Sequence, residues 1–215
     1  MSGIGQQSVA VFEDAVFQAL QRMDAEAVPG GRGPTGLNWY GGYAKPDQKR
    51  PQTEPCWSSR LAELLPRLGY PARAEVRYPR SPEGSGGICD VVAVLPDEAN
   101  LWLEIKGAWP RYWGRTSPTY RSYLFHPLLP GLDDKSHTVP LDVEKLKALK
   151  PPDAGHCALL LLGFDSDRDS MDADVAKLVQ LAGLGQPSWV TYTKSWKAVN
   201  RPGENVKCWM WVRAV

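Results

Sequence analysis

Two short apolar runs separated by a turn constrain the fold of this chain most strongly. Residues 88–95 and 101–106 are rich in β-branched or aromatic side chains. Pro96, Asp97 and Asn100, which lie between them, are residues that favour turns. The pattern therefore predicts a β-hairpin, with each run forming one strand.

Charged residues interrupt both runs, with Asp90 in the first and Glu104 and Lys106 in the second. Because side chains alternate along a strand, Glu104 and Lys106 share one face, and pairing of the strands can place Asp90 beside Glu104. A carboxylate in an apolar strand needs a partner. Two carboxylates and an ammonium could bind a metal ion and a phosphate, or Lys106 could form a plain salt bridge with either acid.

The triplet of an acid, any residue and a lysine is weak evidence by itself, because about one match is expected by chance in a chain of this length. Residues 47–49 and 133–135 also match. Both of these lie in polar segments flanked by glycine or proline, with no predicted strand before them. Their context favours Glu104 and Lys106 as the functional pair.

With Asp90 on one strand and Glu104-Ile105-Lys106 on the next, residues 53–164 resemble the PD-(D/E)XK nuclease superfamily. The resemblance implies an α/β, restriction-endonuclease-like mixed β-sheet flanked by helices. It implies that Asp90, Glu104 and the Ile105 carbonyl hold Mg²⁺ or Mn²⁺, with Lys106 as the catalytic lysine. Cys89 stands where many members have proline. The implied activity is phosphodiester hydrolysis, of DNA rather than RNA, in restriction, repair or phage defence.

Many members of this superfamily add a carboxylate from the preceding helix, and Glu54 and Glu63 are the two candidates. The predicted sheet-facing stripe consists of Leu61, Leu64, Leu65 and Leu68. Glu54 falls on this stripe with Trp57, whereas Glu63 points away, beside Arg60 and Arg67. We therefore predict that Glu54 completes the metal site or orients water; the alternative is that it only complements the helix dipole.

The segment after Lys106 combines aromatic rings with guanidinium groups, and residues 107–132 include no acid. Such a composition suits phosphate contacts and base stacking. The predicted nucleic-acid contacts are Arg111, Tyr112, Trp113, Arg115 and Arg121, while Trp109, Tyr120 and Tyr123 belong to the same pattern. The alternative is a packed surface loop.

The remaining sequence predicts one domain of 215 residues in four parts. Residues 1–27 form an N-terminal helix, 28–52 a Gly/Pro-rich connector, 53–164 the nuclease-like core, and 165–215 a C-terminal helix and strands. Within the core, residues 141–149 predict a helix and 157–164 a strand buried on both faces. The resemblance allows Asp142 or Lys145 of that helix to line the site, but a solvated helix face is the favoured interpretation.

Composition limits the class of protein. With 43% hydrophobic and 23% charged residues, the chain is typical of a globular enzyme domain. A formal net charge of +1 gives no overall attraction to nucleic acid, so any phosphate-binding surface must be local. The four cysteines form no metal-binding or disulfide pattern and are predicted to be reduced core residues. The absence of a signal peptide or membrane span predicts a cytoplasmic protein without a membrane partner. The competing function is a non-catalytic nucleic-acid-binding or assembly subunit. For either function, the expected partners beside nucleic acid are a second copy of the chain or another protein in a larger complex.

Overall fold

The computed structural model describes residues 3–26, 54–79, 87–108, 110–112, 115–116, 120–135, 137–150, 153–165, 170–199 and 203–215. For residues 3–10, 54–56, 111–112, 115–116 and 164–165, it describes the backbone but not the side chains. The predicted connector, 28–52, lies outside the described residues.

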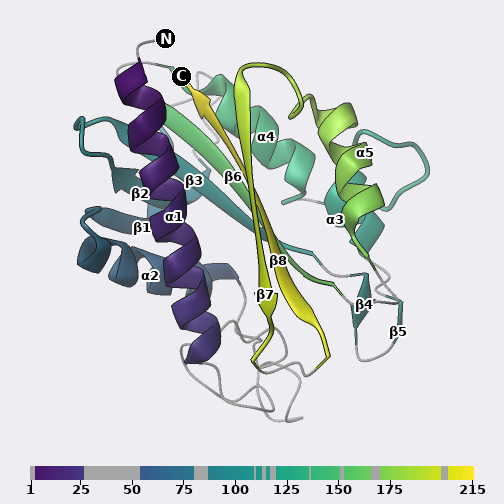
Figure 1. Cartoon of the computed structure of the whole chain (residues 1–215). Coiled ribbons are helices and arrows are strands. Elements are labelled where there is room, and N and C mark those ends of the chain that lie inside the picture. Colours follow the sequence, from purple (N-terminus) through teal and green to yellow (C-terminus); the bar gives the residue numbers. More distant parts are fainter. Residues whose placement is uncertain are drawn as a thin grey trace.

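A six-stranded mixed sheet forms the centre of the molecule, in the order β1-β2-β3-β6-β8-β7 (Figure 1). The strands are β1 (Ala72–Arg77), β2 (Ile88–Val94), β3 (Asn100–Gly107), β6 (His156–Asp165), β7 (Trp189–Lys197) and β8 (Asn205–Ala214). β3 and β6 are parallel, and the other neighbouring pairs are antiparallel. The predicted hairpin at 88–106 and the α/β class with a mixed sheet are confirmed.

β6 occupies the centre of the sheet because its sequence is apolar on both faces. Ala158, Leu160 and Leu162 pack into the cluster on one side of the sheet, while Leu159 and Leu161 pack into the cluster on the other. The predicted burial of this strand on both faces is therefore confirmed. The connection from β3 to β6 includes a helix, as a parallel pair requires.

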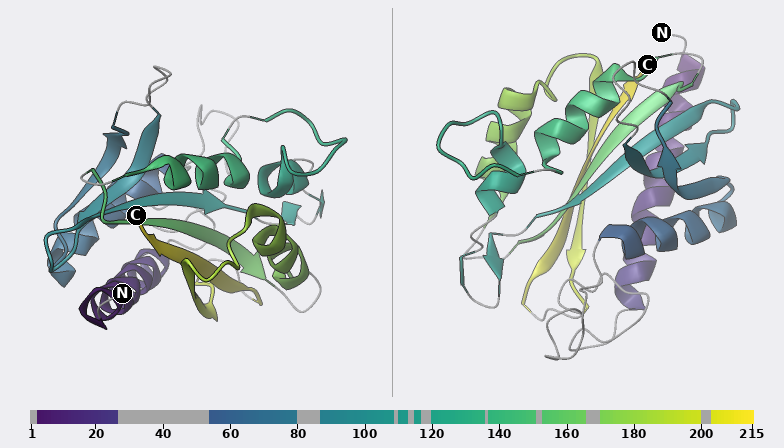
Figure 2. Two further views of the ribbon diagram at one scale, coloured as in Figure 1. Left: turned by 90° about the horizontal axis from the view of Figure 1, so that it is seen from above. Right: turned by 180° about the vertical axis from the view of Figure 1, so that it is seen from behind.

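Helices cover both faces of the sheet. Their bounds are α1 (Gly3–Ala25), α2 (Glu54–Leu64), α3 (Tyr120–Phe125), α4 (Val139–Ala148) and α5 (Asp172–Ala182). Side chains of α1 and α2 join the hydrophobic cluster on one face, and those of α3, α4 and α5 join the cluster on the other. Figure 2 shows α1 and α4 on opposite sides of the sheet.

The predicted helix at 53–69 is shorter than expected. The α-helix ends at Leu64 and continues as a 3₁₀ helix, η1 (Leu65–Leu68), which contains Pro66 and ends at Gly69 with φ of 92°. The tighter winding changes the direction of the last side chains. Leu68 is consequently 39% exposed, so its placement on the sheet-facing stripe was wrong.

β1 and β2 both change face at one shared position. Ala72 of β1 packs on the α1 face and Val76 of the same strand packs on the α4 face, although strict alternation would place both on one face. In β2, Val91 and Cys89 differ in the same way. The register is the same before and after this kink, since Ala74 pairs with Val91 and Val76 pairs with Cys89. The residues between them are Glu75, whose φ is 54°, and Asp90.

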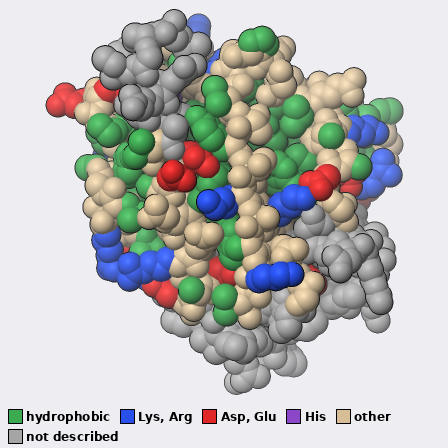
Figure 3. Space-filling view, in the orientation of Figure 1, with side chains coloured by type: hydrophobic (Ala, Val, Ile, Leu, Met, Phe, Trp, Pro, Cys, Tyr) green, Lys and Arg blue, Asp and Glu red, His purple; other side chains and the backbone are tan. Residues whose placement is uncertain are grey.

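Other described features bear on the predictions. β4 (Arg111–Tyr112) and β5 (Arg115–Thr116) form a separate two-stranded sheet that lies away from the main sheet (Figure 1). The cysteines 89, 157 and 208 are free and buried, as predicted. In the described part of the chain, no helix has the length and apolar character needed to cross a bilayer. The face drawn in Figure 3 mixes acidic, basic and apolar side chains, so its described residues form no continuous basic surface.

Glu75→Gly tests the backbone strain at the kink. A left-handed conformation costs a residue with a Cβ about 1–2 kcal/mol, which exceeds the entropic cost of glycine. Glu75→Gly should therefore raise the free energy of unfolding slightly, by up to about 1 kcal/mol. Arg77→Gly, at an exposed and regular position of the same strand, should lower it. Urea denaturation measures both, and a loss of stability in Glu75→Gly equal to that in Arg77→Gly would contradict the strain.

Candidate carboxylate and lysine site

The side chain of Asp90 accepts a hydrogen bond from β3 at the point where the pairing of β2 and β3 ends. The two strands pair from Val94–Asn100 to Val91–Leu103 and not beyond. The next amide on β3, that of Ile105, donates instead to Oδ2 of Asp90 at 2.7 Å. A strand residue directs its N–H and C=O to the same neighbour, so the Ile105 carbonyl faces the side on which Asp90 lies.

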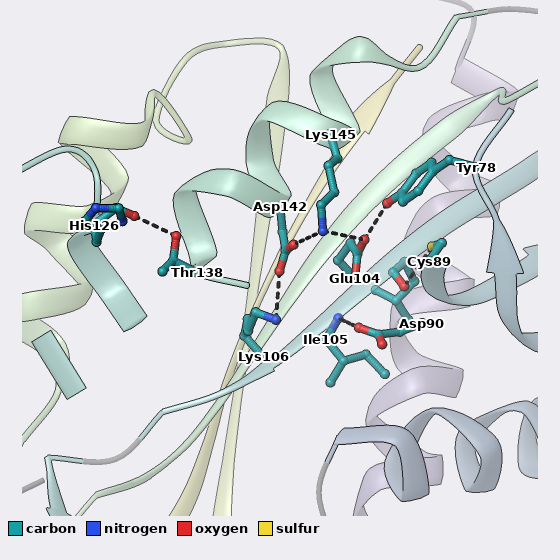
Figure 4. A network of polar contacts seen from close by, with 11 residues as sticks. Tyr78, Cys89, Asp90, Glu104, Ile105, Lys106, His126, Thr138, Asp142 and Lys145 are labelled. Carbon is teal, nitrogen blue, oxygen red and sulfur yellow. Dashed lines mark hydrogen bonds and ion pairs between the residues drawn. The ribbon is translucent and has the colours of Figure 1, made fainter. Parts of the chain in front are cut away.

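Glu104 is 3% exposed and accepts a hydrogen bond from the Tyr78 hydroxyl, at 2.6 Å from Oε1. The Tyr78 ring stacks on Trp102, with 5.1 Å between the ring centroids. The kink in β1 makes this contact possible because it turns Tyr78 to the α4 face (Figure 4). The buried carboxylate thus has the partner that its apolar setting requires.

Lys106 pairs with a carboxylate from α4. Its Nζ lies 3.0 Å from Oδ2 of Asp142, and Nζ of Lys145 lies 2.7 Å from Oδ1 of the same residue. Lys145 also approaches Oε1 of Glu104, at 4.0 Å. Figure 4 shows the resulting chain of contacts, which runs from Lys106 through Asp142 and Lys145 to Glu104 and Tyr78.

Asp142 corrects one prediction from the sequence. It is 1% exposed, so the favoured solvated helix face is wrong at this position. Lys106, at 6% exposure, forms an ion pair with this residue of α4, whereas the hairpin pattern suggested only Asp90 and Glu104 as its partners. Asp90, Glu104, Lys106, Asp142 and Lys145 are together called the charge cluster below.

Burial raises the pKa of the Glu104 carboxyl from 4.5 to about 9, and the nearby charges of Asp142 and Asp90 act in the same direction. Burial also raises the pKa of Asp90, although the hydrogen bond from Ile105 opposes this shift. Asp90 and Glu104 are hydrogen-bonded to each other through their side chains. One proton is therefore held between these two carboxyls near neutral pH.

The paired carboxyls of Asp90 and Glu104 fit a hard cation. Mg²⁺ is held in proteins by one or two carboxylates and keeps several waters. Asp90, Glu104 and the Ile105 carbonyl supply oxygen donors of this type, and a divalent cation would take the place of the proton that the two carboxyls share. The described residues contain no group of three or more Asp, Glu, His or Cys side chains arranged to hold a metal. The candidate metal position thus depends on two carboxyls and one backbone carbonyl.

The helix carboxylates occupy different surroundings from the charge cluster. Glu63 is exposed and pairs with Arg60, with Oε2 2.7 Å from Nη1, as its predicted outward direction requires. Glu54 is the first residue of α2, and its side chain lies outside the described residues. α2 packs on the α1 face of the sheet, whereas Glu104 and Lys106 face α4. Any role of Glu54 would require its side chain to reach the site where β2 and β3 separate, and this role stays a prediction.

The predicted nucleic-acid segment is described only in part. The side chains of Arg111, Tyr112 and Arg115, and the whole of Trp113, lie outside the described residues. Arg121 is exposed on α3. Tyr120 instead belongs to the fold, because it is buried and its hydroxyl donates to Asp174 at 3.0 Å.

Three members of the contact network, Tyr78, Asp142 and Lys145, were not among the predicted site residues, although the resemblance allowed Asp142 or Lys145 to line the site. A signal for Asp142 was present, because Val139, Val143 and Leu146 are buried and the residue at 142 belongs to the same helical stripe. A carboxylate on such a stripe must meet a buried cation or donor. Tyr78 had no comparable signal, since strict alternation along β1 does not reveal the kink.

Glu104→Gln tests the raised pKa of the Glu104 carboxyl. A carboxyl with a raised folded pKa stabilises the fold below its unfolded pKa, and that contribution is lost as the pH rises through the folded value. The free energy of unfolding of the metal-free wild type should therefore decline between about pH 5 and pH 9, by up to about 1 kcal/mol per pH unit. Glu104→Gln should show a smaller decline.

Denaturation at a series of pH values in the presence of a chelator measures this difference. Glu63→Gln is the matched control, since its exposed side chain pairs only at the surface. It should follow the wild type. Parallel curves for wild type and Glu104→Gln would show that Glu104 does not carry the shifted pKa.

Comparison with protein-family models, curated proteins and solved structures gave no match to this chain.

Proposed function

We propose that the protein is a divalent-metal-dependent nuclease that hydrolyses phosphodiester bonds. The observation that carries the proposal is the meeting of Asp90, Glu104 and Lys106 at the point where β2 and β3 separate. Two of these groups are paired carboxyls and the third is a buried ammonium held by a carboxylate. This combination can bind a cation and stabilise negative charge in one place.

The order of elements supports the proposal. α2 is followed by the antiparallel strands β1, β2 and β3, then by α4 and the parallel strand β6. This is the order expected of a restriction-endonuclease-like core, with the remaining elements (α1, β4, β5, α3, α5, β7 and β8) as additions. DNA is the proposed substrate, because the resemblance that motivates the nuclease assignment favours it over RNA.

Each residue has a distinct task in the proposed reaction. Asp90 and Glu104 bind Mg²⁺ or Mn²⁺ together with the Ile105 carbonyl. When bound, the cation supplies Lewis-acid activation of water and neutralises charge on the phosphate. Asp142 holds Lys106 in position, and Lys106 stabilises the charge that develops on the phosphate oxygens as the bond to the leaving oxygen breaks. The low exposure of Glu104 and Lys106 strengthens these electrostatic effects because it excludes bulk water.

A non-catalytic binding or assembly subunit is the second candidate, and the same burial favours it. Lys106 and Asp142 form an ion pair with little access to solvent, as a purely structural pair would. The two functions differ in what Lys106 contributes. A structural lysine affects stability alone, whereas a catalytic lysine affects turnover in a protein that still folds.

Lys106→Ala separates the two functions. The purified variant should cleave plasmid DNA with Mg²⁺ at least about 100-fold more slowly than wild type, because charge stabilisation at the transition state is lost. Its DNA affinity should remain, and its melting transition should stay cooperative but move to lower temperature, because Asp142 keeps only Lys145 as an ammonium partner. Lys135→Ala is the matched control, since Lys135 ends the polar triplet 133–135, and this variant should cleave like wild type. Wild-type cleavage by Lys106→Ala would remove the proposed mechanism, and an inactive but metal-binding and DNA-binding wild type would favour the non-catalytic subunit.

Replacing Arg111, Arg115 and Arg121 by glutamine tests the proposed nucleic-acid contacts. If these side chains neutralise phosphates, the triple variant should bind duplex DNA more weakly. The slope of log affinity against log salt should fall by about 0.9 for each phosphate that is no longer neutralised. Fluorescence anisotropy with chelator at several salt concentrations measures both quantities. The control removes three cations of α1 and β7, Arg22, Lys194 and Lys197, and should leave the slope unchanged. Equal effects in the two variants would show that the segment does not bind DNA specifically.

A further inference from the structure

Asp142 is shared between two ammonium groups, and this sharing bears on how many cations the charge cluster accepts. Oδ1 lies 2.7 Å from Nζ of Lys145, and Oδ2 lies 3.0 Å from Nζ of Lys106. Oδ2 is buried and accepts no hydrogen bond from the described residues. Its contact with Lys106 is therefore an ion pair only. Both oxygens of Asp142 thus face positive charge from the protein itself.

Lys145 links the two acidic parts of the charge cluster. Its ammonium lies between Asp142 of α4 and Oε1 of Glu104 on β3, at 2.7 and 4.0 Å. A carboxylate pair of this kind, in a two-metal hydrolase, would hold a second divalent ion about 3.5–4 Å from the first. Lys145 occupies the space between the two carboxylates in which such an ion would bind.

We propose that the protein binds one divalent cation, between Asp90 and Glu104, and that the Lys145 ammonium takes the place of a second. The proposal rests on the metal-dependent function proposed above and extends it to the number of cations and the role of Lys145. Lys145 is then a fixed monovalent cation that faces the phosphodiester. Its side chain is 36% exposed, whereas those of Asp142 and Glu104 are 1% and 3% exposed. It is therefore a positive group of the charge cluster that a substrate phosphate can reach from solvent.

The formal charges of the cluster support a single ion. Once the proton shared by Asp90 and Glu104 is displaced, three ionised carboxylates and two ammonium groups leave one negative charge. One divalent cation changes this to one positive charge, which a phosphodiester group with its single negative charge would balance. A second divalent cation would leave three positive charges in a buried site, and burial makes such an excess costly.

Counting bound Mn²⁺ on the full-length protein tests the proposal without any measurement of cleavage. Isothermal titration with Mn²⁺, and detection of free Mn²⁺ by electron paramagnetic resonance, give the number of ions per chain. The wild type should bind one ion. Lys145→Ala should bind two, because removal of the ammonium exposes Asp142 and Glu104 to a second cation. Lys145→Arg should bind one, since the positive charge stays.

Lys147→Ala is the matched control, because Lys147 lies on the same helix and pairs with Glu144 at the surface. It should bind one ion. Lys145→Met, which keeps most of the alkyl chain, replaces Lys145→Ala if the latter does not fold. Two ions on the wild type, or one ion on the folded Lys145 variants that lack the charge, would overturn this inference and leave the nuclease proposal intact. A wild type that binds no Mn²⁺ would overturn both.

Discussion

The hydrogen bond from the Ile105 amide to the Asp90 carboxylate determines the geometry of the site. It forms where the β2–β3 ladder ends, so the amide receives a side-chain acceptor instead of a backbone carbonyl. This contact fixes the Asp90 carboxyl beside Glu104, where the two hydrogen-bond to each other. If the ladder continued, the Ile105 amide would donate to a backbone carbonyl of β2, and no hydrogen bond would hold the Asp90 side chain between the strands. The separation of two strands thus places two carboxyls together in an otherwise apolar sheet.

The charge cluster, of which Glu104, Lys106 and Asp142 are buried, is tolerated because each member has a partner of suitable charge or polarity. Tyr78 donates to Glu104, and Asp142 lies between Lys106 and Lys145. Removing one member of such a set leaves another charge buried without its partner, which usually costs several kcal/mol. The cluster also joins elements that are distant in sequence, since its members and their partner Tyr78 come from β2, β3, α4 and the end of β1. Its integrity therefore depends on the docking of α4 against the sheet, and α4 is itself part of the connection between β3 and β6.

The sequence predicted the elements better than the contacts between them. The apolar runs of β2, β3 and β6 have lengths and compositions that specify strands, and the position of β6 at the centre follows from its burial on both faces. The partners of Lys106 and Glu104 depend on tertiary contacts that the hairpin pattern alone does not specify. Asp142 was within reach of the helical-phase argument that was applied to Glu54, and the same argument would have placed it on the buried stripe of α4. The contact of Tyr78 could not be predicted in this way, because the kink at Glu75 reverses the faces of β1 without changing its register.

The kink has a second consequence, for association between copies of the protein. β1 is the first strand in the order of the described sheet, and an edge strand can template the addition of a strand from another chain. Arg73, Glu75 and Arg77 are exposed along this strand, and Glu75 breaks its regular extended geometry. Charged side chains and irregular backbone are the features by which natural proteins disfavour edge-to-edge aggregation. The irregularity that turns Tyr78 towards Glu104 therefore also makes β1 a poor template for a seventh strand.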